Sequence, residues 1–162
     1  MLRHPEKGTA DEVVSASSKP VINAGDGVGE HPTQALLDLY TIHREIGRLE
    51  GLTVTMVGDL KYGRTVHSLS HFLGMYGARL NYVSPESLRM PKQYIDVLNE
   101  KGIEQKELTD IESVMSTTDV LYVTRIQKER FDSDAAYKAV KGVYVITPQL
   151  MQLGKDSMIV MH

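Results

Sequence analysis

The segment from residue 58 to residue 65 places an arginine at the start of a predicted helix. The strand, turn and helix start around it form a pattern that often binds anions. The segment reads Gly-Asp-Leu-Lys-Tyr-Gly-Arg-Thr and lies between an apolar run, 52–57, and a helical pattern. A helix N-terminus carries unpaired N–H groups and partial positive charge, so Arg64 is unfavourable there unless an anion lies nearby. That anion is either a ligand carboxylate or phosphate, or the Asp59 side chain in a surface ion pair with no ligand.

The same segment matches the nucleotide-binding loop G-x-x-x-x-G-K-[ST] except at one position. Arg64 replaces the lysine, whose compact charge fits a tight backbone loop better than a planar guanidinium does. Asp59, Leu60 and Tyr62 also place an acid and two bulky side chains where polyphosphate would lie. A guanidinium suits a carboxylate equally well, through two parallel hydrogen bonds. A degenerate nucleotide loop and a carboxylate site therefore both remain open.

Two further loops carry polar groups that could contact the same ligand. His31 stands directly before a proline suited to the first helical turn, and Gln34 follows one turn later. An imidazole beside a helix N-terminus tends to be neutral, and it can either cap the helix or polarise a bound carbonyl. After the apolar run 120–123, Arg125 and Gln127 project to one side of an extended stretch, toward either a ligand or solvent.

Metal and dinucleotide patterns are weak in this sequence. His67 and His71 have the spacing of two zinc ligands, but Ser68 holds the position of the glutamate in H-E-x-x-H. We therefore expect packed or surface imidazoles and no metal site. The glycines at 25, 27 and 29 lack the G-x-G-x-x-G spacing of a dinucleotide fingerprint.

The elements that must position these loops alternate along the chain. The predicted strands are 20–23, 52–58, 79–83, 119–123, 143–146 and 158–161, and the predicted helices are 32–47, 65–76, 91–101, 109–115, 132–140 and 148–153. The first long helix has an apolar face made of Leu36, Leu39, Tyr40, His43 and Ile46. We expect 15–18 to form a surface turn and 106–112 to be a solvated helix entry.

Alternating strands and helices predict an α/β fold: an open, mostly parallel, Rossmann-like sheet with helices on both faces. Ligands of such sheets bind beyond the carboxyl ends of the strands. The loops that carry His31, Arg64 and Arg125 all follow predicted strands. The fold therefore predicts that their side chains converge on one crevice.

Composition excludes several classes of protein. The chain has 162 residues, 41% of them hydrophobic and 24% charged, with a net charge of −3, as in ordinary globular proteins without polyanion-binding surfaces. The absence of cysteine excludes disulfides and thiolate sites. No apolar stretch approaches the ~20 residues of a membrane span, and the N-terminus has no signal-peptide core. We expect a cytoplasmic protein whose partners are neither nucleic acid nor membrane.

Three segments, in this order, resemble aspartate transcarbamoylase. They are Asn23-Ala-Gly-Asp-Gly27 with His31-Pro-Thr-Gln34, then residues 56–68 around Gly-Arg-Thr, then Tyr122-Val-Thr-Arg-Ile-Gln-Lys-Glu-Arg130. The resemblance runs over essentially the whole chain. Ornithine-using relatives share a His-Pro-x-Gln element but lack the two arginine segments. This difference fits the chemistry, because ornithine has no side-chain carboxylate for an arginine to bind.

The resemblance implies transfer of the carbamoyl group from carbamoyl phosphate to L-aspartate in pyrimidine biosynthesis, giving N-carbamoyl-L-aspartate and phosphate. It implies no metal and no organic cofactor. Carried over by motif, the residues that would contact carbamoyl phosphate are Arg3, His31 and Gln34. Of these, Arg3 and His31 would be catalytic, near the carbonyl oxygen. The residues that would hold aspartate are Arg64, Thr65, Arg125 and Gln127.

The family pattern also includes segments that these residues do not contain. A Ser-x-Arg-Thr phosphate loop and a neighbour-supplied lysine loop would precede Arg3, and Pro-Leu-Pro would follow the final histidine. We expect 1–19 to be a remnant or linker of the carbamoyl-phosphate domain and 20–162 to be a C-terminally truncated aspartate-binding domain. The piece alone is expected to be inactive, and the intact family is homotrimeric. The alternatives are a non-catalytic relic of the aspartate domain and a degenerate nucleotide-binding protein.

Overall fold

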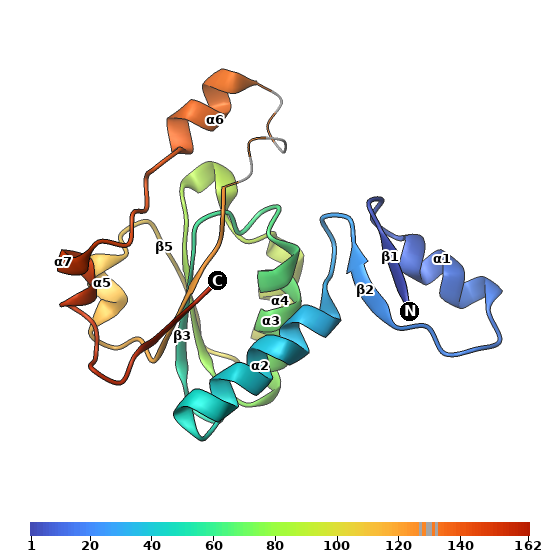
Figure 1. Ribbon diagram of the computed structural model, residues 1–162, viewed down its shortest axis with the longest axis horizontal. Helices are drawn as coiled ribbons and strands as arrows, with labels where there is room; N and C mark the ends of the chain where they lie inside the picture. The colour runs from blue at the N-terminus through green and yellow to red at the C-terminus, as the bar shows by residue number, and fades with distance from the viewer. Residues whose placement is uncertain (127, 129–130, 132) are drawn as a thin grey trace.

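A five-stranded parallel sheet forms the centre of the computed structural model, which describes residues 1–126, 128, 131 and 133–162 (Figure 1). In spatial order the strands are β5 (Gln105–Leu108), β4 (Arg79–Val83), β3 (Thr53–Val57), β6 (Val120–Val123) and β7 (Ile159–Met161). All four neighbouring pairs run parallel. The predicted open α/β sheet is confirmed.

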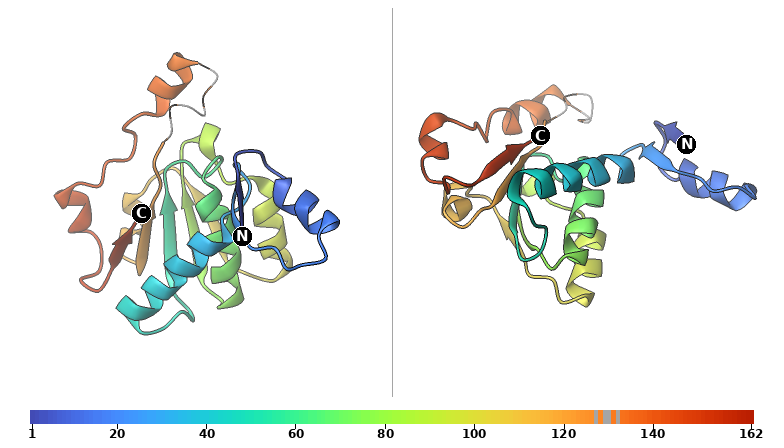
Figure 2. Two further views of the ribbon diagram at one scale, coloured as in Figure 1. Left: turned by 45° about the vertical axis from the view of Figure 1, so that its right-hand side comes forward. Right: turned by 60° about the horizontal axis from the view of Figure 1, so that its bottom comes forward.

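Helices cover both faces of this sheet (Figure 2). One face packs against α2 (Pro32–Ile46), α3 (Arg64–Met75) and α4 (Lys92–Glu100), and the other packs against α5 (Glu112–Met115) and α7 (Pro148–Met151). The short η1 (Glu86–Leu88) and α6 (Asp134–Val140) lie beyond the carboxyl ends of the strands. No helix in the described part of the chain has the length and apolar character that a membrane crossing requires.

The central strand shows why the sheet needs both helical layers. All five residues of β3 are buried. Val54 and Met56 belong to the apolar cluster under α2, α3 and α4, while Val57 belongs to the cluster under α5 and α7. A parallel strand that is covered on both faces reads as a continuous buried run, and this is why its position was predictable.

The first 26 residues form a small unit beside the sheet (Figure 1). Its two strands, β1 (Leu2–His4) and β2 (Asn23–Asp26), pair in parallel, and α1 (Thr9–Ala16) connects them. The strand predicted at 20–23 is therefore displaced, and it pairs with β1 instead of joining the main sheet. α2 follows this unit and leads the chain into the main sheet domain.

Two predictions about the edges of the fold were wrong. Residues 143–146 form no strand, although their Val-Tyr-Val-Ile sequence favours one. Tyr144 and Ile146 pack on the second apolar cluster, but β7 takes the place beside β6 where a further strand would pair. Conversely, β5 was predicted as a helix entry, and pairing with β4 makes it a strand.

The buried face of α2 also differs from the prediction. Leu36 is 53% exposed and Tyr40 is 62% exposed. His43 is exposed as well. The side chains that face the sheet are Ala35, Asp38, Leu39 and Ile42. The prediction failed because the buried face includes the charged residue Asp38, and apolar periodicity places charged residues on the solvent side of a helix.

Candidate active site

A cavity of about 590 Å³ opens at the carboxyl ends of β3 and β6. The chain runs from β3 through β4 to β5 on one side and then returns to place β6 on the other side of β3. This reversal of strand order is the point at which open α/β sheets bind ligands. The lining comes from β1, the starts of α2 and α3, and the residues at and after the end of β6: Arg3, His31, Gln34, Tyr62, Gly63, Arg64, Thr65, Tyr122, Val123, Thr124, Arg125 and His162.

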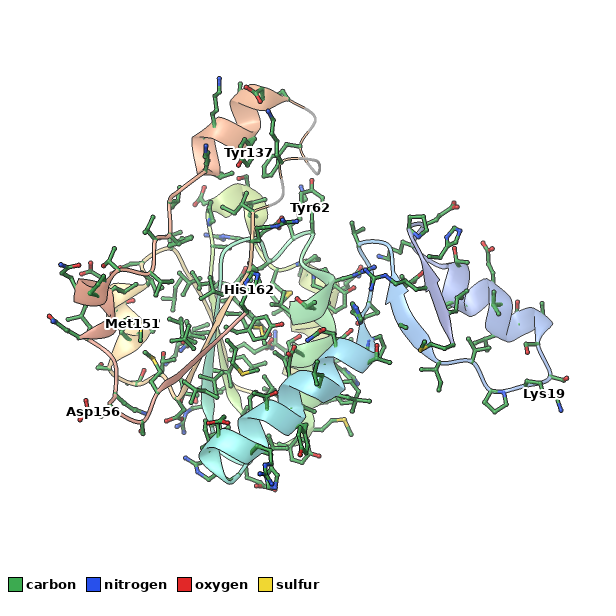
Figure 3. All side chains as sticks on the ribbon, in the orientation of Figure 1. Lys19, Tyr62, Tyr137, Met151, Asp156 and His162 are labelled. Carbon is green, nitrogen blue, oxygen red and sulfur yellow. The ribbon has the colours of Figure 1, made fainter. Side chains whose placement is uncertain are left out.

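The structure therefore brings six of the seven predicted site residues to one cavity. Gln127, the seventh, lies outside the described residues. Sequence reasoning missed Tyr62, Tyr122 and His162, although the first and last follow the ends of β3 and β7 (Figure 3). The His162 Nδ1 atom lies 2.8 Å from the Val123 carbonyl oxygen, which joins the ends of β6 and β7. The position after each strand was the signal that could have identified both.

Three arginines give this cavity its charge. Arg3, Arg64 and Arg125 all line it, and the described lining includes no aspartate or glutamate. Arg64 is the first residue of α3, and its Nη1 atom donates a hydrogen bond to the Gly27 carbonyl oxygen over 3.0 Å. A guanidinium presents donors in a planar arrangement that matches a carboxylate or a phosphate. The cavity is therefore suited to a ligand with several negative charges.

Close packing of the glycine loop against Arg64 fixes the direction of this side chain. Gly25 has φ +127, and a Cβ atom added there would lie 3.0 Å from Arg64 Nη1. Only a residue without a side chain lets the guanidinium pass so near the backbone. The Asn-Ala-Gly-Asp-Gly segment thus holds the arginine in place; it does not itself form a dinucleotide loop.

The turn between β3 and α3 does not form a phosphate loop. Asp59 is 1% exposed, and its Oδ1 atom accepts hydrogen bonds from the backbone N–H groups of Lys61 (3.1 Å) and Tyr62 (2.9 Å). The amides of Gly58, Leu60 and Arg64 donate to backbone carbonyls. A nucleotide loop needs such N–H groups turned toward phosphate. Burial of Asp59 also contradicts the alternative of an exposed Asp59–Arg64 surface pair.

His31 caps α2 and is held as a neutral imidazole. Its Nδ1 atom accepts a hydrogen bond from the Gln34 backbone N–H at 3.3 Å, so the ring proton resides on Nε2. Burial lowers the pKa of His31, and the charges of Arg64 and Arg3 lower it further. Its own backbone N–H donates to Ser68 Oγ at 2.8 Å. A neutral ring with a proton on Nε2 can cap the helix and still donate to a carbonyl oxygen in the cavity.

The two histidines with zinc-like spacing do not form a metal pair. His67 is 1% exposed, and its ring nitrogens lie 2.9 Å from the carbonyl oxygens of Gly29 and Leu60. Its ring stacks on Tyr94 at 4.2 Å, whereas His71 is exposed. No group of three or more potential metal ligands occurs among the residues that the structure describes. His67 instead joins the two loops that carry His31 and Arg64.

The fold and cavity define a doubly wound α/β protein with an arginine-lined cavity at its topological switch point. Two family models match the chain: the carbamoyl-phosphate binding domain of aspartate/ornithine carbamoyltransferase at residues 1–44, and its aspartate/ornithine binding domain at residues 50–162. The chain therefore belongs to the aspartate/ornithine carbamoyltransferase family, which confirms the predicted resemblance.

Individual relatives agree with this assignment. The chain is 59% identical over 161 residues to the multifunctional protein pyr1-3 of Dictyostelium discoideum, covering 99% of this chain and 7% of that protein. It is 50% identical to the aspartate carbamoyltransferase catalytic subunit of Thermococcus gammatolerans, over 100% of this chain and 53% of the subunit. The chain thus spans about half the length of such catalytic subunits.

Solved structures show the same fold. Aspartate transcarbamoylase from Trypanosoma cruzi, in complex with N-(phosphonacetyl)-L-aspartic acid, superimposes with a TM-score of 0.90 and 43% identity, covering 99% of this chain and 53% of that one. The catalytic subunit of the enzyme from M. jannaschii superimposes with a TM-score of 0.84 and 48% identity, over 99% and 52% of the two chains.

Proposed function

We propose that the protein carrying this chain transfers the carbamoyl group of carbamoyl phosphate to L-aspartate, giving N-carbamoyl-L-aspartate and phosphate in pyrimidine biosynthesis. The observation that carries this proposal is the convergence of three arginines and a neutral histidine on one cavity. Carbamoyl phosphate and aspartate together bring a phosphate and two carboxylates, which match that charge. The substrates named for the solved Trypanosoma cruzi complexes support the same pair.

Within this proposal, Arg3 and His31 activate the electrophile. The neutral aspartate amine attacks the carbamoyl carbon, a C–N bond forms, and negative charge develops on the carbonyl oxygen. The Nε2–H of His31 and the guanidinium of Arg3 donate to that oxygen, and fixed donors at a developing oxyanion lower the barrier. The C–O bond to phosphate then breaks, and the departing phosphate takes the extra proton from the amine nitrogen.

Arg64, Thr65 and Arg125 hold aspartate in the proposed complex, and Gln127 is assigned with them by motif. The two arginines bind the two carboxylates, and this orients the amine toward the carbamoyl carbon. Holding two reactants in a reactive geometry contributes several kcal/mol to catalysis. Gln34 contacts carbamoyl phosphate beside His31. This chemistry is a group transfer without a redox step. The further contacts of the phosphate would come, by the family pattern, from the segments that would precede Arg3.

The division of the chain, its assembly and its location stay predictions. We propose that the carbamoyl-phosphate domain extends past the boundary that the sequence predicts between residues 19 and 20, because its family model matches residues 1–44, and that the aspartate-binding domain begins by residue 50. A homotrimer, as the resemblance implies, would appear in light scattering as three times the subunit mass. A cytoplasmic location would appear in cell fractionation.

The direct test of the proposed function is product formation by the protein that carries this chain. We expect N-carbamoyl-L-aspartate from carbamoyl phosphate and L-aspartate, and no carbamoylated product from L-ornithine at the same concentration. Ornithine offers one carboxylate to a site with two arginines for the amino acid, so its second contact is lost. Carbamoylation of ornithine in preference to aspartate would overturn the proposed substrate, and turnover of neither amino acid would overturn the proposed reaction.

A further inference from the structure

A buried hydrogen-bonded group lies directly beneath the cavity. The Gln34 Nε2 atom donates to Asp38 Oδ1 over 2.9 Å, one helical turn further along α2. The hydroxyl group of Tyr122, on β6, donates to Asp38 Oδ2 over 2.8 Å. Asp38 is 3% exposed and Tyr122 is 2% exposed. A carboxylate in such a position, away from solvent, is unfavourable unless its oxygens accept hydrogen bonds, and here each oxygen has a donor.

This arrangement determines which end of the Gln34 amide faces the cavity. An ionised carboxylate only accepts hydrogen bonds, so the amide nitrogen of Gln34 must turn toward Asp38. The carbonyl oxygen of the same amide is then directed away from Asp38, and Gln34 lines the cavity. A side-chain amide without such a partner could present either its donor or its acceptor to a ligand. With Asp38 ionised, Gln34 presents an acceptor.

Tyr122 keeps the group in this state. Burial and the neighbouring charge of Asp38 raise the pKa of Tyr122, so its hydroxyl group remains a donor. Burial raises the pKa of Asp38 above its usual value, and the hydrogen bonds from Gln34 and Tyr122 to the ionised form limit this rise. The groups that face the carboxylate are Gln34 from α2 and Tyr122 from β6, and Thr65 from α3 interacts with the Tyr122 hydroxyl. Loss of the tyrosine donor would therefore favour a protonated Asp38, which can donate to Gln34 and reverse its amide.

We propose that Asp38 and Tyr122 are positioning residues that fix the Gln34 carbonyl oxygen toward the cavity and so select a ligand bearing an N–H donor. This inference rests on the proposed function, in which that donor is the NH₂ group of carbamoyl phosphate. Neither residue touches the substrate in this account; both act through Gln34. Because a buried acceptor without a donor is costly, the arrangement disfavours a ligand with a methyl group at this place.

Two ligands that differ only in this group provide the probe. Carbamoyl phosphate carries NH₂ where acetyl phosphate carries CH₃, and both retain the carbonyl and the phosphate. Binding of each is measured by calorimetry to the protein that carries this chain, for the parent, Tyr122→Phe and Asp38→Asn. The matched control is Tyr82→Phe, which removes a hydroxyl group from an equally buried tyrosine on β4. That hydroxyl donates to Gln105 over 3.0 Å, and Tyr82 does not line the cavity.

We expect Tyr122→Phe to reduce the preference for carbamoyl phosphate over acetyl phosphate about 10-fold, equivalent to ~1.4 kcal/mol. Asp38→Asn should reduce it as well, because an asparagine presents both a donor and an acceptor to Gln34. Tyr82→Phe should leave the preference within about 2-fold of the parent. In Tyr122→Phe the acid limb of carbamoyl phosphate binding should move to higher pH, since Asp38 loses a donor that favours its ionised form.

If Tyr122→Phe binds carbamoyl phosphate and acetyl phosphate more weakly by the same factor, the loss is a general structural one and contradicts the positioning role. An unchanged preference between the two ligands would also contradict it. A parent protein that binds neither ligand would refute the proposed function alone. In that case the side-chain NH₂ signals of Gln34 in NMR still decide the inference. They should shift and exchange faster with solvent in Tyr122→Phe but not in Tyr82→Phe. Identical Gln34 signals in all three proteins would overturn it.

Discussion

Replacing Arg64 with lysine tests whether the turn after β3 holds a carboxylate. Lysine keeps the positive charge but loses the planar arrangement of donors. In the structure the guanidinium donates to the Gly27 carbonyl over 3.0 Å and lies against Gly25. The compact ammonium group cannot maintain that contact and also make two parallel bonds to a substrate carboxylate. The change therefore removes at least one charge-assisted hydrogen bond.

The size of the effect follows from that lost bond. A hydrogen bond to a charged group contributes about 1.5–3 kcal/mol. At ~1.4 kcal/mol for each factor of ten, kcat/KM for aspartate should fall by roughly 10- to 150-fold in Arg64→Lys. Part of the loss should appear in kcat, because a misplaced amine reacts more slowly even when it is bound.

Steady-state kinetics of the protein that carries this chain, with aspartate varied, measure this effect. Arg89→Lys is the matched control, because Arg89 lies outside the cavity and makes a 3.6 Å ion pair with Glu86 on the surface. We expect its kinetics to match those of the parent, since such pairs contribute little. Unchanged aspartate kinetics in Arg64→Lys would refute the contact between Arg64 and a substrate carboxylate. Magnesium-dependent binding of ATP by the same variant would restore the nucleotide-loop interpretation.

Two further predictions concern pH and backbone geometry. Burial and the two neighbouring arginines lower the pKa of His31 in the folded protein, so folding favours the neutral ring. The resulting contribution to the free energy of unfolding is complete above about pH 6.5, and it is lost as the pH falls through the pKa of the folded state. His31→Asn, which retains a capping side chain, should flatten this acid limb in denaturant titrations; a limb identical to the parent's would contradict the assignment. Gly58 has φ +116, and an added Cβ would lie 2.6 Å from the Thr124 carbonyl oxygen. Gly58→Ala should therefore lower the free energy of unfolding by on the order of 2–3 kcal/mol and displace the loop before Arg125. Gly77→Ala, at φ +64 with open space around the Cβ, should cost about 1 kcal/mol, and equal melting temperatures of the two variants would show that the Thr124 contact is unimportant.

The sequence predicted elements whose pattern is local and missed those that depend on neighbours. β3 is a buried run between clear helices, so its place could be predicted. β5 consists of Gln-Lys-Glu-Leu, and only its pairing with β4 makes it a strand. Residues 143–146 have strong strand propensity but no partner strand. Strand propensity is expressed only where a neighbouring strand supplies hydrogen bonds, and this depends on tertiary structure.

The same distinction applies to the site. Arg64 and Arg125 could be predicted because each follows a strand of the main sheet, where parallel sheets bind ligands. His31 follows β2, which lies outside that sheet, and it reaches the cavity as the N-cap of α2. Asp38 could not be predicted, because a carboxylate within a helical pattern reads as solvent-exposed until Tyr122 is seen beside it. Tyr122 itself reads as a core residue of an apolar strand. Buried polar partners that come from distant segments, such as Asp38 and Tyr122, have no local sequence pattern. The residues that position a site are therefore the part that cannot be predicted from sequence.

A crystal structure of the protein that carries this chain, with bound N-(phosphonacetyl)-L-aspartate, tests the central claim most directly. This molecule joins a phosphonate to aspartate and so represents both proposed substrates. We predict that it occupies the cavity at the ends of β3 and β6, with its carbonyl oxygen at Arg3 and His31 and its aspartate carboxylates at Arg64 and Arg125. Electron density for the ligand away from that cavity, or in it with the carboxylates turned from both arginines, would contradict the account.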